Sequence, residues 1–277
     1  MENTAMTYTL GIDASRWDVR LDWAQLKAGG VAFVILKAAQ GASMRDPRFE
    51  QHLQGALAAG LICGAYHWCD PTHDDRRQVE NFLAAIDGKP VAFAAVDVEQ
   101  YWQDWSEWQY KHVTRFIPPG RISQSAKTVA AEIQSRSGLP ALIYTRASFV
   151  RDYARPMLAW LPQWDLWLAH YPYGNGRVSC SWEELRQHFP RISSPALPEG
   201  CRQWRFWQFS AEKFIPPGAR SPLDLNFFNG SLAELRAWCR ADLPELPAVT
   251  PEPAEMLKRL WQAHPEIHPD EEEKKNE

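Results

Sequence analysis

Two carboxylic acids stand two residues apart in the segment VAFAAVDVEQYW, where an apolar run ends at Asp97 and Glu99. Alternate residues of an extended strand point to the same side, so both side chains would share one face. Such a pair suits glycosidic cleavage, because one carboxyl protonates the leaving oxygen while the other stabilises or attacks the positive sugar carbon. Mutual repulsion would raise one pKa and keep one group protonated near neutrality. The competing interpretation is a pair of solvated loop acids, since Asp-x-Glu alone is a weak signal.

Two further acids stand near the ends of other apolar runs. Asp13 follows the first run, and Asp224 lies in the segment SPLDLNFFNG late in the chain. The first and last strands of a closed barrel are neighbours, so four acids from three strand ends could meet in one cleft. Each acid taken singly is more often a cap or a turn residue. The hypothesis of an acidic active site therefore depends on their convergence.

Apolar runs alternate with helix-like segments along the chain. Strands are expected at 8–12, 31–38, 61–68, 91–98, 141–144, 166–169, 205–209 and 223–226, and helices at 21–28, 48–59, 74–85, 124–136 and 231–239. Continuous apolar strands separated by helices predict a parallel sheet that is covered on both faces. The repeat favours the α/β class and a TIM-like (β/α) barrel over a sandwich.

The composition bounds the function. The chain has 277 residues, of which 45% are hydrophobic, enough for one large barrel with a substantial core. A net charge of −4 argues against a general nucleic-acid binder. No stretch of about 20 apolar residues predicts a membrane span. The first ten residues do not resemble a Sec signal peptide. We therefore expect synthesis in the cytoplasm, with action on a cell wall only after release or dedicated export.

The cysteines and the missing motifs narrow the chemistry further. Five cysteines with no Cys-x-x-Cys pair argue against a zinc ribbon or a dense disulfide framework. Free thiols are expected, and one bridge between Cys180 and Cys201 stays open. The sequence contains no His-Glu-x-x-His, P-loop or Gly-x-Ser-x-Gly motif, so neither a metal nor a cofactor is expected.

The composition changes near the end of the chain. The segment LPELPAVTPEP begins at Leu243 and is typical of a proline-rich linker, and DEEEKKNE forms a charged tail. We therefore predict a catalytic barrel over 1–242 and a linker with a tail over 243–277. A monomer is expected.

The opening GIDASRWDVRLDWAQLKAGGVAFVILKAAQG resembles the start of family 25 glycoside hydrolases, the Chalaropsis-type lysozymes. Further matching segments follow in the same order: GAYHW at 64–68, VDVE at 96–99, LWLAHY at 166–171, FWQFS at 206–210 and DLNFFNG at 224–230. The resemblance covers 10–242. It implies an N-acetylmuramidase that acts on the glycan strands of peptidoglycan through a distorted (β/α) barrel. By the same resemblance the motif acids are Asp13, Asp97, Glu99 and Asp224. It also implies that Glu99 is the general acid and that Asp97 assists the sugar cation or the substrate's acetamido group.

Two departures from the family pattern concern substrate binding. The family often has an IKATEG-like string where this chain has LKAAQG, so Gln40 stands where a glutamate is common. A neutral amide can still hydrogen-bond a sugar, and the lost negative charge would lower the pKa of the remaining acids. The segment 102–125 does not align with the family and contains Trp102, Trp105 and Trp108. It is either a sugar-binding loop or a local hydrophobic cluster.

Other substrate-binding residues are expected on the strands. Tyr66 and His67 are consecutive, so they face opposite sides, with Tyr66 toward the cleft and His67 structural. His170 follows an apolar strand and could line the groove. Trp207 is assigned to the groove as well, because flat indole rings cover the apolar faces of sugars. Most of the 14 tryptophans are expected in the core.

Two other functions compete with the muramidase hypothesis. One is a wall-binding barrel without turnover, which Gln40 leaves open although Asp97 and Glu99 are intact. The other is a hydrolase of a different amino-sugar polymer such as chitin, which the acids alone do not distinguish.

Overall fold

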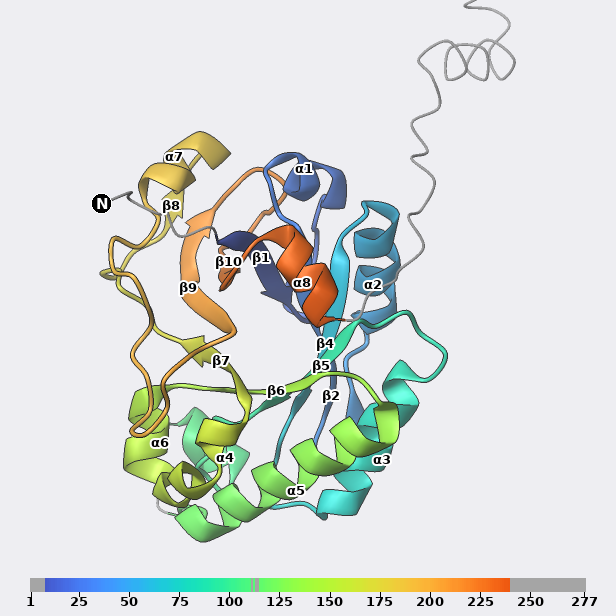
Figure 1. The fold of residues 1–277 in the computed structure, drawn as a ribbon, viewed down its shortest axis with the longest axis vertical. Helices are drawn as coiled ribbons and strands as arrows, with labels where there is room; N and C mark the ends of the chain where they lie inside the picture. The colour runs from blue at the N-terminus through green and yellow to red at the C-terminus, as the bar shows by residue number, and fades with distance from the viewer. Residues whose placement is uncertain (1–7, 111, 113–114, 240–277) are drawn as a thin grey trace, which may run out of the picture. The chain divides into compact units, whose positions relative to one another are not determined.

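The computed structural model describes residues 8–110, 112 and 115–239, and the predicted linker and tail at 243–277 lie outside them. Eight strands form a closed barrel in the order β1-β10-β9-β7-β6-β5-β4-β2, and β2 pairs again with β1 (Figure 1). Their bounds are Thr9–Ala14 for β1, Phe33–Gln40 for β2, Ile62–Trp68 for β4, Phe93–Asp97 for β5, Ala141–Thr145 for β6, Asp165–Ala169 for β7, Phe206–Ile215 for β9 and Leu223–Phe228 for β10. The short strands β3 (Met44–Arg45) and β8 (Val178–Ser179) pair with β2 and β9. The predicted α/β barrel is confirmed.

The last strand departs from the predicted parallel sheet. Neighbouring strands from β1 through β2, β4, β5, β6 and β7 to β9 are parallel, but β10 is antiparallel to both β9 and β1. Only residues 216–222 connect β9 to β10, which suffices for a hairpin but not for a helical crossover. This reversal places Asp224 directly across from Asp13 in the pairing of the two strands.

Helices surround the barrel, and the predicted ones form. Their bounds are Trp23–Ala28 for α1, Phe49–Ala58 for α2, Asp75–Ile86 for α3, Trp105–Gln109 for α4, Pro119–Ser137 for α5, Ala147–Tyr153 for α6, Trp182–Gln187 for α7 and Leu232–Trp238 for α8, with 3-10 turns at Arg155–Ala159 and Leu161–Gln163. Helix α5 begins earlier than the predicted start at residue 124, because Pro119 lies in the first turn, where its missing N–H breaks no hydrogen bond. In the described parts of the chain, no helix has the length and apolarity to cross a membrane. All five cysteines are free thiols.

Aromatic rings fill the end of the barrel where the parallel strands begin. Phe93 and Phe206 stack with ring centroids 5.2 Å apart, and Trp238 of α8 lies 5.3 Å from Phe93 and 5.5 Å from Phe206. A Cβ at Gly64 would come within 2.3 Å of the Phe93 ring, so only glycine fits there. Helix α8 thus closes this end with a solid floor, and the opposite end is left for polar residues.

Trp238→Ala should lower the free energy of unfolding by about 3 kcal/mol, since it removes a large ring from this floor. It also removes the hydrogen bond from the Trp238 Nε1 to Asp165 Oδ2, 2.9 Å long. Chemical denaturation measures the effect. Trp17→Ala is the matched control, because Trp17 is 75% exposed and its loss should be nearly neutral. Equal stability of the two variants would contradict the assignment of Trp238 to the core.

Candidate functional site

The four predicted acids lie together at the carboxyl end of the parallel strands. Asp13 of β1 and Asp97 of β5 are buried, whereas Glu99 and Asp224 keep some exposed surface. Their charges act on one another: Glu99 and Asp13 raise the pKa of Asp97, and Asp13 and Glu99 raise that of Asp224. Acids from three separate strands therefore converge, as the sequence predicted.

Burial sets the protonation of this acid cluster. Loss of hydration is the largest cause for every member: it raises the pKa of Asp13 to about 7, holds those of Asp97 and Asp224 well above the ordinary range, and raises that of Glu99. The charges of Arg146 and Lys37 oppose the rise at Glu99. Strongly coupled acids titrate as a group, so protons remain on the cluster near neutral pH. A general acid for glycosidic cleavage needs such a retained proton.

Two amides hold Asp13 in place. The Nδ2 of Asn226 and the Nε2 of Gln208 donate to the same Asp13 oxygen at 2.7 and 2.8 Å. These bonds favour the ionised form and partly offset the effect of burial on its pKa. Neither amide was predicted as a site residue. The sequence did carry a signal for Asn226. It is a polar residue two positions after Asp224 in an otherwise apolar strand, and therefore lies on the same face as that acid.

The orientation of both amides is itself determined by other donors. The Nε1 of Trp167 donates to Asn226 Oδ1 at 2.7 Å, and the hydroxyl of Tyr144 donates to Gln208 Oε1 at 2.8 Å. Tyr171 also donates its hydroxyl to Gln208 Oε1. Because each amide oxygen already accepts, each NH₂ group must point at Asp13. The network makes the position of Asp13 independent of solvent.

A half-buried lysine balances the other side of the cluster. The charge of Lys37 on β2 lowers the pKa of Asp97 and of Glu99, against the dominant effect of burial. Its Nζ donates to Gln40 Oε1 at 2.8 Å and lies 4.5 Å from the centre of the Trp68 ring. A neutral amide as partner leaves the positive charge of Lys37 directed at the acids. Gln40 thus lies at the mouth of the barrel, which is the end where the four acids meet. Lys37 is a site residue that the sequence analysis missed.

Asp97 has one oxygen ready for a ligand. Its Oδ1 is buried and makes no hydrogen bond to any described residue. A buried acceptor without a partner is costly, so it marks a place where a substrate group or a proton would bind. No three His, Cys, Asp or Glu side chains are arranged to hold a metal ion among the described residues.

The strand residues predicted to bind substrate divide by the face they occupy. Tyr66 is buried inside the barrel, where the charges of the four acids help to raise its pKa. His67 is buried on the outer side with its Nε2 3.2 Å from Gln78 Oε1, the position of a structural histidine. His170 is partly exposed, and its Nδ1 accepts from the backbone N–H of Ala196 at 2.9 Å.

Trp207 corrects one assignment. It has no exposed surface, and its Nε1 donates to the carbonyl of His170 at 2.8 Å. Its ring lies 6.2 Å from Phe227 on the outer side of the sheet. Because Gln208 points inward, its neighbour Trp207 must point outward. It therefore packs the barrel against its surroundings and does not contact a sugar.

The three tryptophans after the acids form one stack. The Trp108 ring lies 4.5 Å from that of Trp102 and 4.7 Å from that of Trp105, with interplanar angles of 24° and 27°. Trp102 is 4% exposed, whereas Trp105 is 56% exposed. Trp102 also lies 6.3 Å from Trp68, the ring that contacts Lys37. The stack thus runs from the acidic mouth outward, with a structural inner end and an accessible outer end.

An acid-lined mouth on a closed barrel defines the class of barrel glycoside hydrolases that act through carboxyl groups. The family model for glycosyl hydrolases family 25 matches residues 12–217, and the chain belongs to this family.

Individual relatives agree with this assignment. The chain is 30% identical over 239 residues to the uncharacterised protein YegX of Escherichia coli K12, covering 84% of this chain and 74% of YegX. It is 25% identical over 241 residues to Lysozyme M1 of Streptomyces globisporus, covering 82% and 70% of the two chains. The crystal structure of a lysozyme from Streptomyces coelicolor superposes with a TM-score of 0.66 at 23% identity, over 85% of this chain and 98% of that one. This last likeness supports the fold.

Asp13→Asn should become more stable relative to the wild type as the pH rises. A carboxyl whose folded pKa is raised stabilises the fold below its unfolded pKa, and loses that contribution as the pH passes the folded value. For Asp13 the window runs from its unfolded value of about 4 to the folded value of about 7. The stability difference should grow by about 1.4 kcal/mol per pH unit across it.

Urea denaturation of both proteins across this pH range measures the difference. The difference removes the contribution of His67, because burial lowers its pKa to about 4 and gives both proteins the same opposite trend. It reports Asp13 together with the acids coupled to it. The exposed Asp87 provides the control variant Asp87→Asn. A difference that does not change with pH would show that Asp13 is not desolvated.

Proposed function

We propose that this glycoside hydrolase cleaves the bond between N-acetylmuramic acid and N-acetylglucosamine in peptidoglycan, with Glu99 as the general acid. The observation that supports it best is the position of Glu99: partly exposed at the mouth, with a raised pKa, beside the buried Asp97. Its family and its lysozyme relatives favour this substrate.

In the proposed reaction Glu99 gives its proton to the glycosidic oxygen as the bond to the sugar carbon breaks. Positive charge develops on that carbon, and Asp97 faces it, either directly or through the acetamido group of the substrate. Lys37 stabilises the ionised form of Asp97 meanwhile. A water molecule then attacks the sugar carbon and returns a proton to Glu99. Hydrolysis consumes one water and restores both carboxyl groups.

Asp13 and Asp224 have a different proposed role, because they lie on β1 and β10 and not with the reacting pair at the end of β5. In its ionised form Asp13 raises the pKa of Asp97 and of Asp224, and negative charge on either acid would strengthen the field that favours a sugar cation. The amides on Asp13 keep that charge in a fixed position. A barrel that only bound the wall would have no use for four desolvated acids, so this arrangement favours turnover.

The product of digestion distinguishes a muramidase from a hydrolase of another amino-sugar polymer. Digestion of purified peptidoglycan, followed by identification of the new reducing end, should reveal N-acetylmuramic acid. Digestion of chitin with no cleavage of peptidoglycan would instead favour the other amino-sugar polymer.

Glu99→Gln should fold normally and lose activity by about 10²–10⁴-fold, since an amide cannot deliver the proton. Asp97→Asn should also be severely impaired, because it removes the charge that faces the developing cation. Turnover of peptidoglycan is the measurement, and Glu132→Gln on the exposed side of α5 is the control. Near-wild-type turnover by Glu99→Gln would overturn its role. A fully active Asp97→Asn beside an inactive Asp13→Asn would reverse the roles of those two acids.

We assign the outer end of the tryptophan stack to a long glycan strand. Trp105 presents an accessible indole face, and the stack connects it to the mouth through Trp102 and Trp68. A bridge between Trp102 and Phe116 closes the loop that holds the stack. Flat rings supply apolar contact area that hydrogen bonds to hydrated sugars do not provide. Tyr66, Gln40 and His170 are kept as sugar-binding residues nearer the acids.

Trp105→Ala should raise KM for long glycans with a smaller change in kcat, as expected when binding is lost equally from ground and transition states. Steady-state kinetics on strands of different length measure this, with the largest effect on the longest strands. Trp102→Ala is the paired variant: its side chain is buried, so its main effect should be a lower Tm. A destabilised Trp105→Ala with unchanged KM would assign Trp105 to packing instead.

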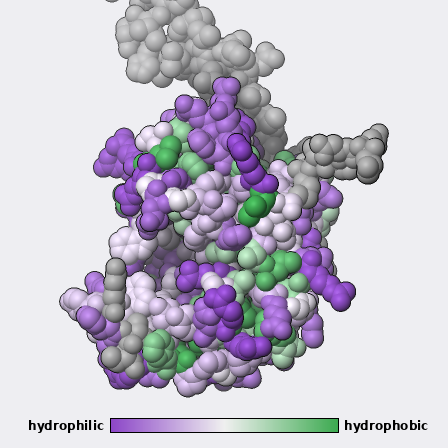
Figure 2. Space-filling model, turned by 90° about the vertical axis from the view of Figure 1, so that its left-hand side faces the viewer, coloured by the Kyte–Doolittle hydropathy of each residue, from purple (hydrophilic) through white to green (hydrophobic). Residues whose placement is uncertain are grey.

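A monomer that reaches the wall after release or dedicated export is part of the same proposal. The face in Figure 2 is mostly hydrophilic, and its apolar residues form small separate groups. This face lacks the apolar centre that is typical of a stable oligomer interface.

A further inference from the structure

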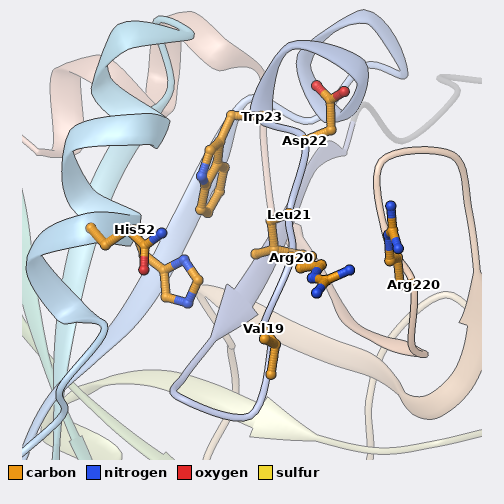
Figure 3. Close-up of a pocket in the computed structure, with 8 residues that line it drawn as sticks. Val19, Arg20, Leu21, Asp22, Trp23, His52 and Arg220 are labelled. Carbon is orange, nitrogen blue, oxygen red and sulfur yellow. The ribbon is translucent and has the colours of Figure 1, made fainter.

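A hollow lies at the rim of the barrel, between the loop that follows β1 and the loop that precedes β10 (Figure 3). Its volume is about 350 Å³. The loop after β1 and the start of α1 line it from one side, His52 and Gln51 of α2 from another, and Arg220 from the loop between β9 and β10. The mechanism proposed above uses none of these residues.

The hollow is fixed to the two strands that carry Asp13 and Asp224. Its β1–α1 loop directly follows Asp13, and the loop that holds Arg220 directly precedes Asp224. The backbone N–H of Asp22 donates to the carbonyl of Gly218 at 2.8 Å, which joins the two loops. The Nε2 of His52 lies 3.2 Å from the carbonyl oxygen of Ser15, which connects α2 to the same loop. A ligand in this hollow would therefore lie next to the mouth.

The hollow carries an excess of positive charge among its lining residues. Arg20 and Arg220 are exposed, and neither forms an ion pair with any described residue. They come from the two loops and lie on the same side of the hollow, away from Trp23 and His52 (Figure 3). The nearby Asp22 caps α1 and accepts from the backbone and side-chain N–H groups of Gln25 at 3.0 and 2.8 Å. These bonds lower the pKa of Asp22, so it stays ionised, and the hollow is lined by two guanidinium groups against one carboxylate.

We infer that this hollow binds the carboxylate groups of the short peptides attached to peptidoglycan strands. The inference rests on the proposed function, since it concerns a second part of the same substrate. The acid cluster repels carboxylates, whereas two guanidinium groups offer charge-assisted hydrogen bonds to them. Leu21 and Trp23 add apolar surface for the aliphatic part of a peptide. The glycan would cross the acidic mouth while its peptide leaves over the basic rim.

The test compares two soluble substrates: glycan strands that carry their peptides, and the same strands after an amidase has removed them. Accessory phosphate polymers are stripped from both, so that peptide carboxylates differ between them. The variants are Arg20→Gln, Arg220→Gln and the double variant. Lys127→Gln is the control, because Lys127 is exposed on α5 at another part of the barrel.

The wild type should show the lower KM on peptide-bearing strands. Each arginine variant should raise that KM by about two- to fivefold with kcat unchanged, as for an exposed ion pair. Kinetics on peptide-free strands should be the same for all variants, and added salt should reduce the wild type's preference.

Two results would overturn the inference. One is an unchanged KM of the double variant on peptide-bearing strands, and the other is an equal loss on both substrates. A wild type that cleaves neither substrate would overturn the proposed function itself. If every variant is active on peptide-free strands, the proposed function holds, and only the inference about peptide binding is under test.

Discussion

The burial of four mutually repelling carboxyl groups is the constraint on which the rest of this structure depends. Loss of hydration raises the pKa of each acid, and the charges of neighbouring acids raise those of Asp13, Asp97 and Asp224 further. Such a cluster is unfavourable for the fold, so the barrel must offset it elsewhere. The aromatic floor and α8 provide buried area at the opposite end. Amide donors around Asp13 and the half-buried Lys37 provide partners at the mouth.

Each compensating group leaves the chemistry possible. The amides hold one Asp13 oxygen, and Lys37 acts through space, so Asp97 keeps an oxygen without a partner. Complete hydrogen bonding of Asp97 within the protein would stabilise the fold but would also compete with the substrate. The hydrogen bonding of the acid cluster within the protein is therefore incomplete, as expected for a site that must interact with a substrate.

Two surfaces extend the mouth in chemically different directions. The tryptophan stack presents an apolar plate at Trp105, and the rim hollow presents the guanidinium groups of Arg20 and Arg220. A sugar ring and a carboxylated peptide need these two kinds of surface respectively. Both surfaces arise from loops at the same end of the barrel, where variation does not disturb the strands.

Local periodicity in the sequence was enough to determine most of the barrel and the core of its site. The spacing of two between Asp97, the last residue of β5, and Glu99 predicts that both acids share one face. The order of apolar runs predicts strands and helices, because both properties depend on near neighbours along the chain. The direction of β10, the outward position of Trp207 and the amides around Asp13 were decided by the tertiary structure. So were the buried and exposed ends of the tryptophan stack and the meeting of Arg20 with Arg220. These features join residues far apart in sequence, and only the closing of the barrel sets the register that brings them together.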